Sequence, residues 1–227
     1  KINFPYLLLL ISGGHSQYLI VKGLGKYKQL GTTIDDALGE AFDKTGKMLG
    51  LDYPGGEKVE KIAKKGDKNF FKLPKPIINK AGCNLSFAGL KTAVLRETKK
   101  INSEKMKYNL AASFQNTINI ILRKKTLIAM DLFRKNLSLN KKYPFVIAGG
   151  VAANKSIRES MSSICKDKNF TPIFPSLKFC GDNAAMIAWA GIQRFKKNMI
   201  DDVNVSAKSR WPLDKNAPYM KGPGLKL

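Results

Sequence analysis

The chain has 227 residues, of which 44% are apolar and 25% are charged. This balance is typical of a globular protein with a buried core, and it excludes a disordered chain, a collagen-like fibre and a coiled coil. The 40 Lys and Arg residues outnumber 17 Asp and Glu residues, which gives a net charge of +23. Such an excess favours a polyanionic partner such as nucleic acid, although a lysine-rich composition bias accounts for it equally well.

Cysteine spacing and hydropathy bear on the compartment. Cys83, Cys165 and Cys180 form no CxxC pair, so neither a disulfide framework nor a zinc knuckle is predicted, and a reducing compartment is favoured. The first apolar run, at 6–11, is too short to span a bilayer, and no cleavage signal follows it. We expect a cytoplasmic or organellar protein with no membrane segment. Because the chain enters a strand directly after Lys1, we also expect the sequence to start in mid-protein.

Hydrophobic periodicity and turn residues predict an alternation of strands and helices. In chain order, the predicted elements are strands at 6–12, 17–22 and 27–31, helices at 35–49, 59–65, 90–98 and 108–133, a strand at 144–148, a helix at 154–164, a strand at 171–174 and a helix at 182–195. Thr32 and Thr33 are expected to cap the first helix.

A three-stranded meander followed by alternating helices and strands predicts an α/β fold. It suits one lobe of the ribonuclease-H-like, actin-like ATPase architecture, with a helical insertion. We expect residues 1–65 and 141–205 to form the lobe and 66–140 to form a mostly helical insertion with the long helix. Residues 206–227 are expected to be an irregular surface tail.

Two segments in the first third carry residues suited to ligand binding. Gly13 and Gly14 follow the first strand, where successive backbone N–H groups can form a nest for phosphate oxygens; the alternative is a plain hairpin turn. Asp36, Glu40 and Asp43 share one helical face. Asp43 lies beyond the reach of the helix dipole, so it is either a ligand contact or part of a solvated face.

Two further segments lie at predicted helix starts. Gly149-Gly150 joins a buried strand to a helix, which allows a base or ribose to lie against the backbone near Asn154; an ordinary turn is the alternative. Asp182 is either a helix cap, like its neighbour Asn183, or a metal ligand. His15 is the single histidine, which excludes an HExxH zinc site and any two-histidine metal site within this chain.

Seven ordered motifs together resemble the TsaD family of tRNA N6-adenosine threonylcarbamoyltransferases. They are Leu-Ile-Ser-Gly-Gly-His-Ser, Ile-Asp-Asp-Ala-x-Gly-Glu-Ala-Phe-Asp-Lys-Thr, Leu-Asp-Tyr-Pro-Gly-Gly, Ser-Phe-x-Gly-Leu-Lys-Thr, Ala-Gly-Gly-Val-x-Ala-Asn, Asp-Asn-x-Ala-Met-Ile-Ala and Arg-Trp-Pro-Leu. The resemblance implies transfer of a threonylcarbamoyl group from threonylcarbamoyl-AMP to N6 of adenosine 37, in tRNAs that read codons beginning with A.

The resemblance also implies site residues, cofactors and partners. The phosphate or adenylate loop is implied at Leu10, Ile11, Ser12, Gly13 and Gly14. Other implied nucleotide contacts are Asp43, Gly56 and Asn154. Asp182 is implied as the one ligand from this chain to a divalent metal, iron or zinc, whose two histidines belong to an N-terminal lobe that this chain lacks. ATP or ADP are alternative occupants of the nucleotide site, and the implied partners are tRNA, a TsaB-like scaffold and a TsaE-like ATPase.

Two other functions remain open on the sequence. One is a small-metabolite kinase of the same fold, which would share the glycine-rich turns. The other is a non-catalytic scaffold subunit, which would be expected to lack the nucleotide and metal motifs. Because half of a two-lobed site is missing, we expect the 227-residue chain alone to be inactive and to bind metal weakly. We also expect Asp43→Ala to leave folding almost untouched.

Overall fold

The structure, a computed structural model, describes residues 2–135, 137, 141–207 and 211–218. Its strands are β1 (Tyr6–Ile11), β2 (Ser16–Gly23), β3 (Lys26–Thr32), β4 (Tyr143–Ala148) and β5 (Phe170–Ile173). Its α-helices are α1 (Leu38–Met48), α2 (Gly55–Ala63), α3 (Ala88–Thr98), α4 (Glu104–Arg134), α5 (Lys155–Asp167) and α6 (Ala184–Phe195), with short 3-10 helices η1 (Gly150–Ala153) and η2 (Leu177–Phe179).

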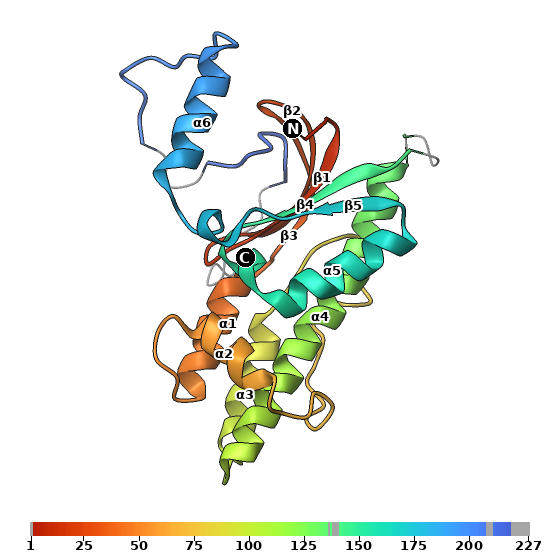
Figure 1. The fold of residues 1–227 in the computed structure, drawn as a ribbon, viewed down its shortest axis with the longest axis vertical. Helices are drawn as coiled ribbons and strands as arrows, with labels where there is room; N and C mark the ends of the chain where they lie inside the picture. Colours follow the sequence, from red (N-terminus) through yellow and green to blue (C-terminus); the bar gives the residue numbers. More distant parts are fainter. Residues whose placement is uncertain (1, 136, 138–140, 208–210, 219–227) are drawn as a thin grey trace.

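The strands form one sheet in the order β3-β2-β1-β4-β5 (Figure 1). The first three are antiparallel neighbours, and β4 and β5 run parallel to β1. Alternate residues of β1 are buried, with Leu7, Leu9 and Ile11 fully so, as expected for a strand with one face on a core. A meander continued by parallel strands confirms the predicted ribonuclease-H-like α/β lobe.

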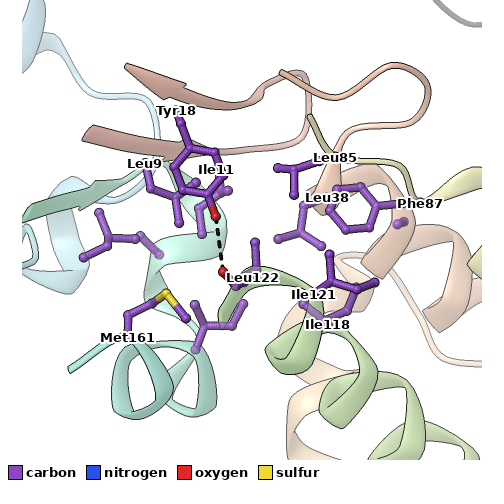
Figure 2. Packing of buried hydrophobic residues seen from close by; sticks show 14 of the residues in the cluster. Leu9, Ile11, Tyr18, Leu38, Leu85, Phe87, Ile118, Ile121, Leu122 and Met161 are labelled. Atoms are coloured by element: carbon purple, nitrogen blue, oxygen red, sulfur yellow. Dashed lines mark hydrogen bonds between the residues drawn. The ribbon is translucent and has the colours of Figure 1, made fainter. Parts of the chain in front are cut away.

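The core lies between the sheet and the long helix α4 (Figure 2). Phe114 packs edge to face on Phe42 of α1, with ring centroids 5.1 Å apart. Tyr18 of β2 reaches the same helix, where its hydroxyl lies 2.9 Å from the Thr126 hydroxyl. Burial raises the pKa of Tyr18, so the phenol stays protonated and is held to the helix by hydrogen bonds. Although α4 belongs to the segment predicted as an insertion, it therefore supplies much of the core of the lobe.

Helix α4 also buries a charged side chain, Lys125. Its ammonium donates hydrogen bonds to the carbonyls of Lys80, at 2.8 Å, and Gly82, at 3.2 Å. Burial lowers the pKa of Lys125, because the low-dielectric interior disfavours the charged form. The two carbonyls offset part of that cost and fasten the irregular segment before α3 to the helix.

The start of α1 differs from the prediction. Thr32 and Thr33 do not cap it, because Thr32 ends β3 and Thr33 pairs with Leu85 in an isolated bridge. The helix begins only at Leu38, whose N–H donates to the Ser16 hydroxyl at 2.8 Å. Asp35 caps a different helix, because its Oδ1 accepts the N–H of Phe87 at 2.8 Å at the start of α3.

The interpretation of three carboxylates on one helical face is also wrong. Asp36 precedes α1, is buried, and forms an ion pair with Lys91 of α3. Glu40 pairs with Lys44 one turn further along α1. Only Asp43 of the three turns toward a ligand-sized cavity.

The C-terminal part of the chain is the least buried. None of the twelve residues of α6 is buried, and the helix stands apart from the others in Figure 1. Of the expected tail, 208–210 and 219–227 lie outside the described residues. Asp214 of the described part accepts the N–H of Gln29 at 2.8 Å, which places it against β3. No helix within the described ranges combines the length and apolarity that a membrane span requires.

Candidate functional site

A pocket of about 560 Å³ opens at the end of β1, where the turn after this strand meets three helices. Its wall comes from that turn, from α1, from the start of α2 and from the segment that joins η1 to α5. The residues that line it are Gly13, Gly39, Phe42, Asp43, Tyr53, Pro54, Gly56, Glu57, Glu60, Gly150, Val151, Ala153, Asn154, Lys155 and Leu177.

The turn after β1 is organised by Ser12. Its hydroxyl oxygen accepts the N–H groups of Gly14, at 3.3 Å, and His15, at 3.0 Å. These two N–H groups are therefore engaged within the turn, which fits the hairpin alternative better than an open nest. Gly13 lines the pocket. A Cβ on Gly39 would lie 2.8 Å from the backbone nitrogen of Gly13, so only glycine lets the first turn of α1 approach so closely.

The second glycine turn packs on the first. Gly149 has φ of +97°, and a Cβ there would lie 2.2 Å from the carbonyl oxygen of Ile11. Any other residue would be strained in its backbone and would collide with β1. This contact holds the starts of η1 and α5 beside the turn that contains Gly13.

Asp43 joins two helices at the floor of the pocket. Its Oδ1 accepts the N–H of Gly55, at 2.9 Å, and of Gly56, at 3.2 Å. These are orphan donors of the first turn of α2, whose own N-cap residue, Pro54, supplies no side-chain acceptor. Asp43 thus caps α2 from within α1, and the expectation that Asp43→Ala would leave folding untouched does not fit this geometry.

Asn154 caps α5, as Asp43 caps α2. Its Oδ1 accepts the N–H of Ile157 at 3.0 Å, and its Nδ2 donates to Oε1 of Gln115 at 2.8 Å. Glu60 of α2 then accepts the N–H of Lys155 at 2.8 Å. Two helices, α2 and α5, therefore begin at this pocket, each with a polar side chain on its first N–H groups.

This arrangement suits a ligand with a flat, polar body. The first N–H groups of α2 and α5 are occupied by Asp43, Glu60 and Asn154, so the charge of a phosphate would be met by Lys155, a cationic residue of the lining. Asp43 has a second carboxylate oxygen, which is a suitable acceptor for a ribose hydroxyl. Tyr53 lines the pocket and is 83% exposed, so its ring is open to stacking with a base.

The pocket brings together four of the residues implied by resemblance: Gly13, Asp43, Gly56 and Asn154. Leu10 and Ile11 lie in β1, and the Ile11 side chain points into the core (Figure 2). Ser12 and Gly14 shape the turn without lining the pocket. Their roles as ligand contacts stay predictions.

Sequence reasoning missed Tyr53, Glu57 and Glu60, which also line the pocket. Tyr53 lies within the Leu-Asp-Tyr-Pro-Gly-Gly motif, whose glycines drew the prediction to Gly56. The two glutamates follow the glycine pair within the first turns of α2, and they carried no local signal that separates a pocket residue from a solvated helix face.

The described residues do not by themselves fit the metal that the resemblance implies. They contain no group of three or more His, Cys, Asp or Glu side chains that could hold an ion. Asp182 is exposed and lies just before α6, outside the lining of the pocket. One carboxylate is too few for tight binding, since catalytic metal sites use about three protein ligands.

Fold and pocket together define a class: a lobe of the actin-like, ribonuclease-H-like proteins with a candidate nucleotide pocket at the glycine-rich turns. Residues 1–189 match the family described as TsaD: tRNA N6-adenosine threonylcarbamoyltransferase. The chain belongs to the TsaD family.

Curated relatives of that name agree over the whole chain. The chain is 59% identical to the tRNA N6-adenosine threonylcarbamoyltransferase of Pelagibacter ubique, over 100% of this chain and 63% of that protein. It is 47% identical to the one of Rhodospirillum rubrum, over 98% of this chain and 62% of that protein. It is 50% identical to the one of Rickettsia rickettsii, over 94% of this chain and 63% of that protein. The chain thus spans less than two thirds of the length of these relatives.

Proposed function

We propose that the protein carrying this chain transfers a threonylcarbamoyl group from threonylcarbamoyl-AMP to N6 of adenosine 37 of tRNA, and that the pocket at Gly13 and Asp43 binds the adenylate. One observation carries the proposal. Four residues that the family resemblance marks as nucleotide contacts come from four separate segments, and they line a single pocket of about 560 Å³.

The reaction needs orientation more than a covalent catalyst. The N6 amine attacks the carbamoyl carbon and gives up one proton to solvent, the bond from that carbon to the phosphate oxygen breaks, and AMP leaves with the bonding electrons. Negative charge grows on the departing phosphate, where the ammonium of Lys155, a residue of the lining, stabilises it. Asp43 and Asn154 are each fixed by hydrogen bonds to a helix start, so they orient the nucleotide without rearranging.

The proposed partners follow from the same reaction. The relatives' name includes tRNA, and a net charge of +23 suits a polyanion. The adenosine lies in a single-stranded loop, where an RNA base can be turned out and read. A TsaB-like scaffold, a TsaE-like ATPase and a cytoplasmic location complete the proposal. A metal at Asp182 would need further ligands from outside the described residues.

The role of Asp43 is tested with AMP, the product nucleotide, by calorimetry. Asp43→Asn keeps an acceptor for the α2 N–H groups but removes the charge, so we expect near-normal stability and weaker binding. A hydrogen bond to a charged group contributes about 1.5–3 kcal/mol, or roughly 10- to 100-fold in affinity. Asp43→Ala should weaken binding similarly and also cost about 1 kcal/mol of folding free energy, the usual value of a lost cap.

The matched control is Asp52→Asn, which removes an exposed carboxylate that forms an ion pair with Lys58. It should leave AMP affinity unchanged. Equal affinity for AMP in wild type and Asp43→Asn would refute the pocket assignment. The activity itself is measured as modified adenosine in a tRNA transcript, with threonylcarbamoyl-AMP and both partner proteins present. Phosphorylation of small metabolites in place of tRNA modification would favour a kinase.

A further inference from the structure

A second pocket, of about 280 Å³, lies beside the first, between the end of α2, the middle of α4 and the start of α5. Seven of the ten residues that line it have polar or charged side chains. The residues are Glu60, Ala63, Lys64, Gly66, Lys68, Ala112, Gln115, Asn116, Asn119 and Ser156.

The rim of this pocket is cationic. Lys64 and Lys68 are exposed, and neither forms an ion pair with any residue in the described part of the chain. Glu60 is the single acidic residue of the lining, and its Oε1 already accepts the N–H of Lys155. Two free ammonium groups over a pocket with one engaged carboxylate favour an anionic ligand.

The wall opposite the lysines is built from side-chain amides. Nε2 of Gln115 donates to Oδ1 of Asn119 at 3.4 Å, and Nδ2 of Asn119 donates to the Ser156 hydroxyl at 2.8 Å. Nδ2 of Asn116 donates to the carbonyl of Lys68 at 3.3 Å, which holds the rim against the wall. Oδ1 of Asn116 and the hydroxyl proton of Ser156 are left for a ligand.

The two pockets share a boundary. Glu60 lines both. Gln115 of the second pocket accepts a hydrogen bond from Asn154 of the first at 2.8 Å. Hydrogen bonds therefore run from Asn154 through Gln115 and Asn119 to Ser156, so a ligand in the second pocket lies next to a ligand in the first.

We propose that the second pocket binds the phosphodiester backbone of an RNA strand whose reacting nucleotide lies at the mouth of the first pocket, next to the bound adenylate. Lysine ammonium groups contact phosphate oxygens, and Asn116 and Ser156 offer an acceptor and a donor to ribose hydroxyls. This inference rests on the proposed function for the identity of RNA as the polymer. It adds the place where the strand is held next to the reacting nucleotide.

The test compares two lysine pairs of equal charge. Lys64→Ala with Lys68→Ala removes the rim, and Lys22→Ala with Lys26→Ala removes two exposed lysines from the β2–β3 hairpin. Binding of a labelled RNA hairpin with a single-stranded loop is followed by anisotropy over a range of salt. The rim variant should bind more weakly and lower the slope of log affinity against log salt by about 1.4, the value for two phosphates of a single strand.

The hairpin control should change neither quantity, and Lys64→Arg with Lys68→Arg should restore the wild-type slope. Equal losses in both alanine pairs would show that net charge alone acts, and would overturn the proposal, as would no loss in the rim pair. AMP binding, measured in the same samples, separates the two hypotheses. A wild-type protein that binds RNA through the rim but binds no AMP contradicts the proposed function and leaves the RNA site standing.

Discussion

Helices α4 and α6 are both rich in apolar residues, but they lie in opposite surroundings. Sixteen of the 31 residues of α4 are buried, including one lysine, whereas none of the twelve residues of α6 is. Trp189 of α6 is 64% exposed and Phe195 is 71% exposed. The spacing of apolar residues thus predicts that a segment is helical, but it does not tell whether neighbouring segments of the same chain cover it.

The largest expected effect is in α4. Phe114→Ala removes a fully buried ring that packs edge to face on Phe42. We expect a loss of about 3–5 kcal/mol in the free energy of unfolding, because the cavity adds to the lost transfer energy. Urea denaturation measures it, and a loss below about 1 kcal/mol would mean that α4 is not the centre of the core.

A second effect, on the order of 2 kcal/mol, is expected at high pH from Cys165 of α5. Burial raises the pKa of this thiol from 9.0 to about 12. Between those values the unfolded chain loses the proton and the folded chain keeps it, so stability is full below pH 9 and falls as the pH rises toward 12. Urea midpoints across this range measure the fall, and Cys165→Ala should flatten it. An unchanged slope in that variant would show that other groups cause the loss.

A smaller effect is expected where the sheet meets α4. Tyr18→Phe removes the hydroxyl that lies 2.9 Å from the Thr126 hydroxyl. The same hydroxyl lies 3.4 Å from the carbonyl oxygen of Leu122, and loss of these buried hydrogen bonds should cost about 1 kcal/mol. The melting temperatures of Tyr18→Phe and Tyr27→Phe are compared. Tyr27 is a half-buried tyrosine of β3, so its variant measures the general cost of losing a phenol hydroxyl.

The smallest effect is expected in α6. Trp189→Ala removes a large side chain that is mostly exposed, so the free energy of unfolding of this chain should change by no more than about 0.5 kcal/mol. The same denaturation assay used for Phe114→Ala measures it. A loss comparable to that of Phe114→Ala would mean that α6 is covered in solution, and the contrast between the two helices would fail.

Local signals predicted much of this fold. The strands fall within one or two residues of their predicted bounds, because alternation of apolar residues reports directly on a half-buried strand. Asn154 and Asn183 cap the helices that follow them, at 3.0 Å to Ile157 and Met186, and such caps are readable from neighbouring residues.

Side-chain hydrogen bonds between distant segments could not be predicted from neighbouring residues. Ser16 caps a helix 22 residues further along, and Asp35 caps one more than 50 residues away. No residue near Asp35 in the sequence indicates that its partner is the N–H of Phe87. At the candidate site, the family motifs indicated Asp43 as a nucleotide contact. They did not indicate that the same side chain also caps α2, because that contact depends on how α1 packs on α2.

The packing of α1 on α2 links ligand binding at Asp43 to the stability of the first turn of α2. One oxygen of the Asp43 carboxylate holds the first two N–H groups of α2, and the other is open to the pocket, so a ligand on the second oxygen also restrains the first. Opening of the α2 start and departure of the ligand are then linked events. Slower solvent exchange of the Gly55 and Gly56 amide protons would register occupancy of the pocket without any label on the ligand.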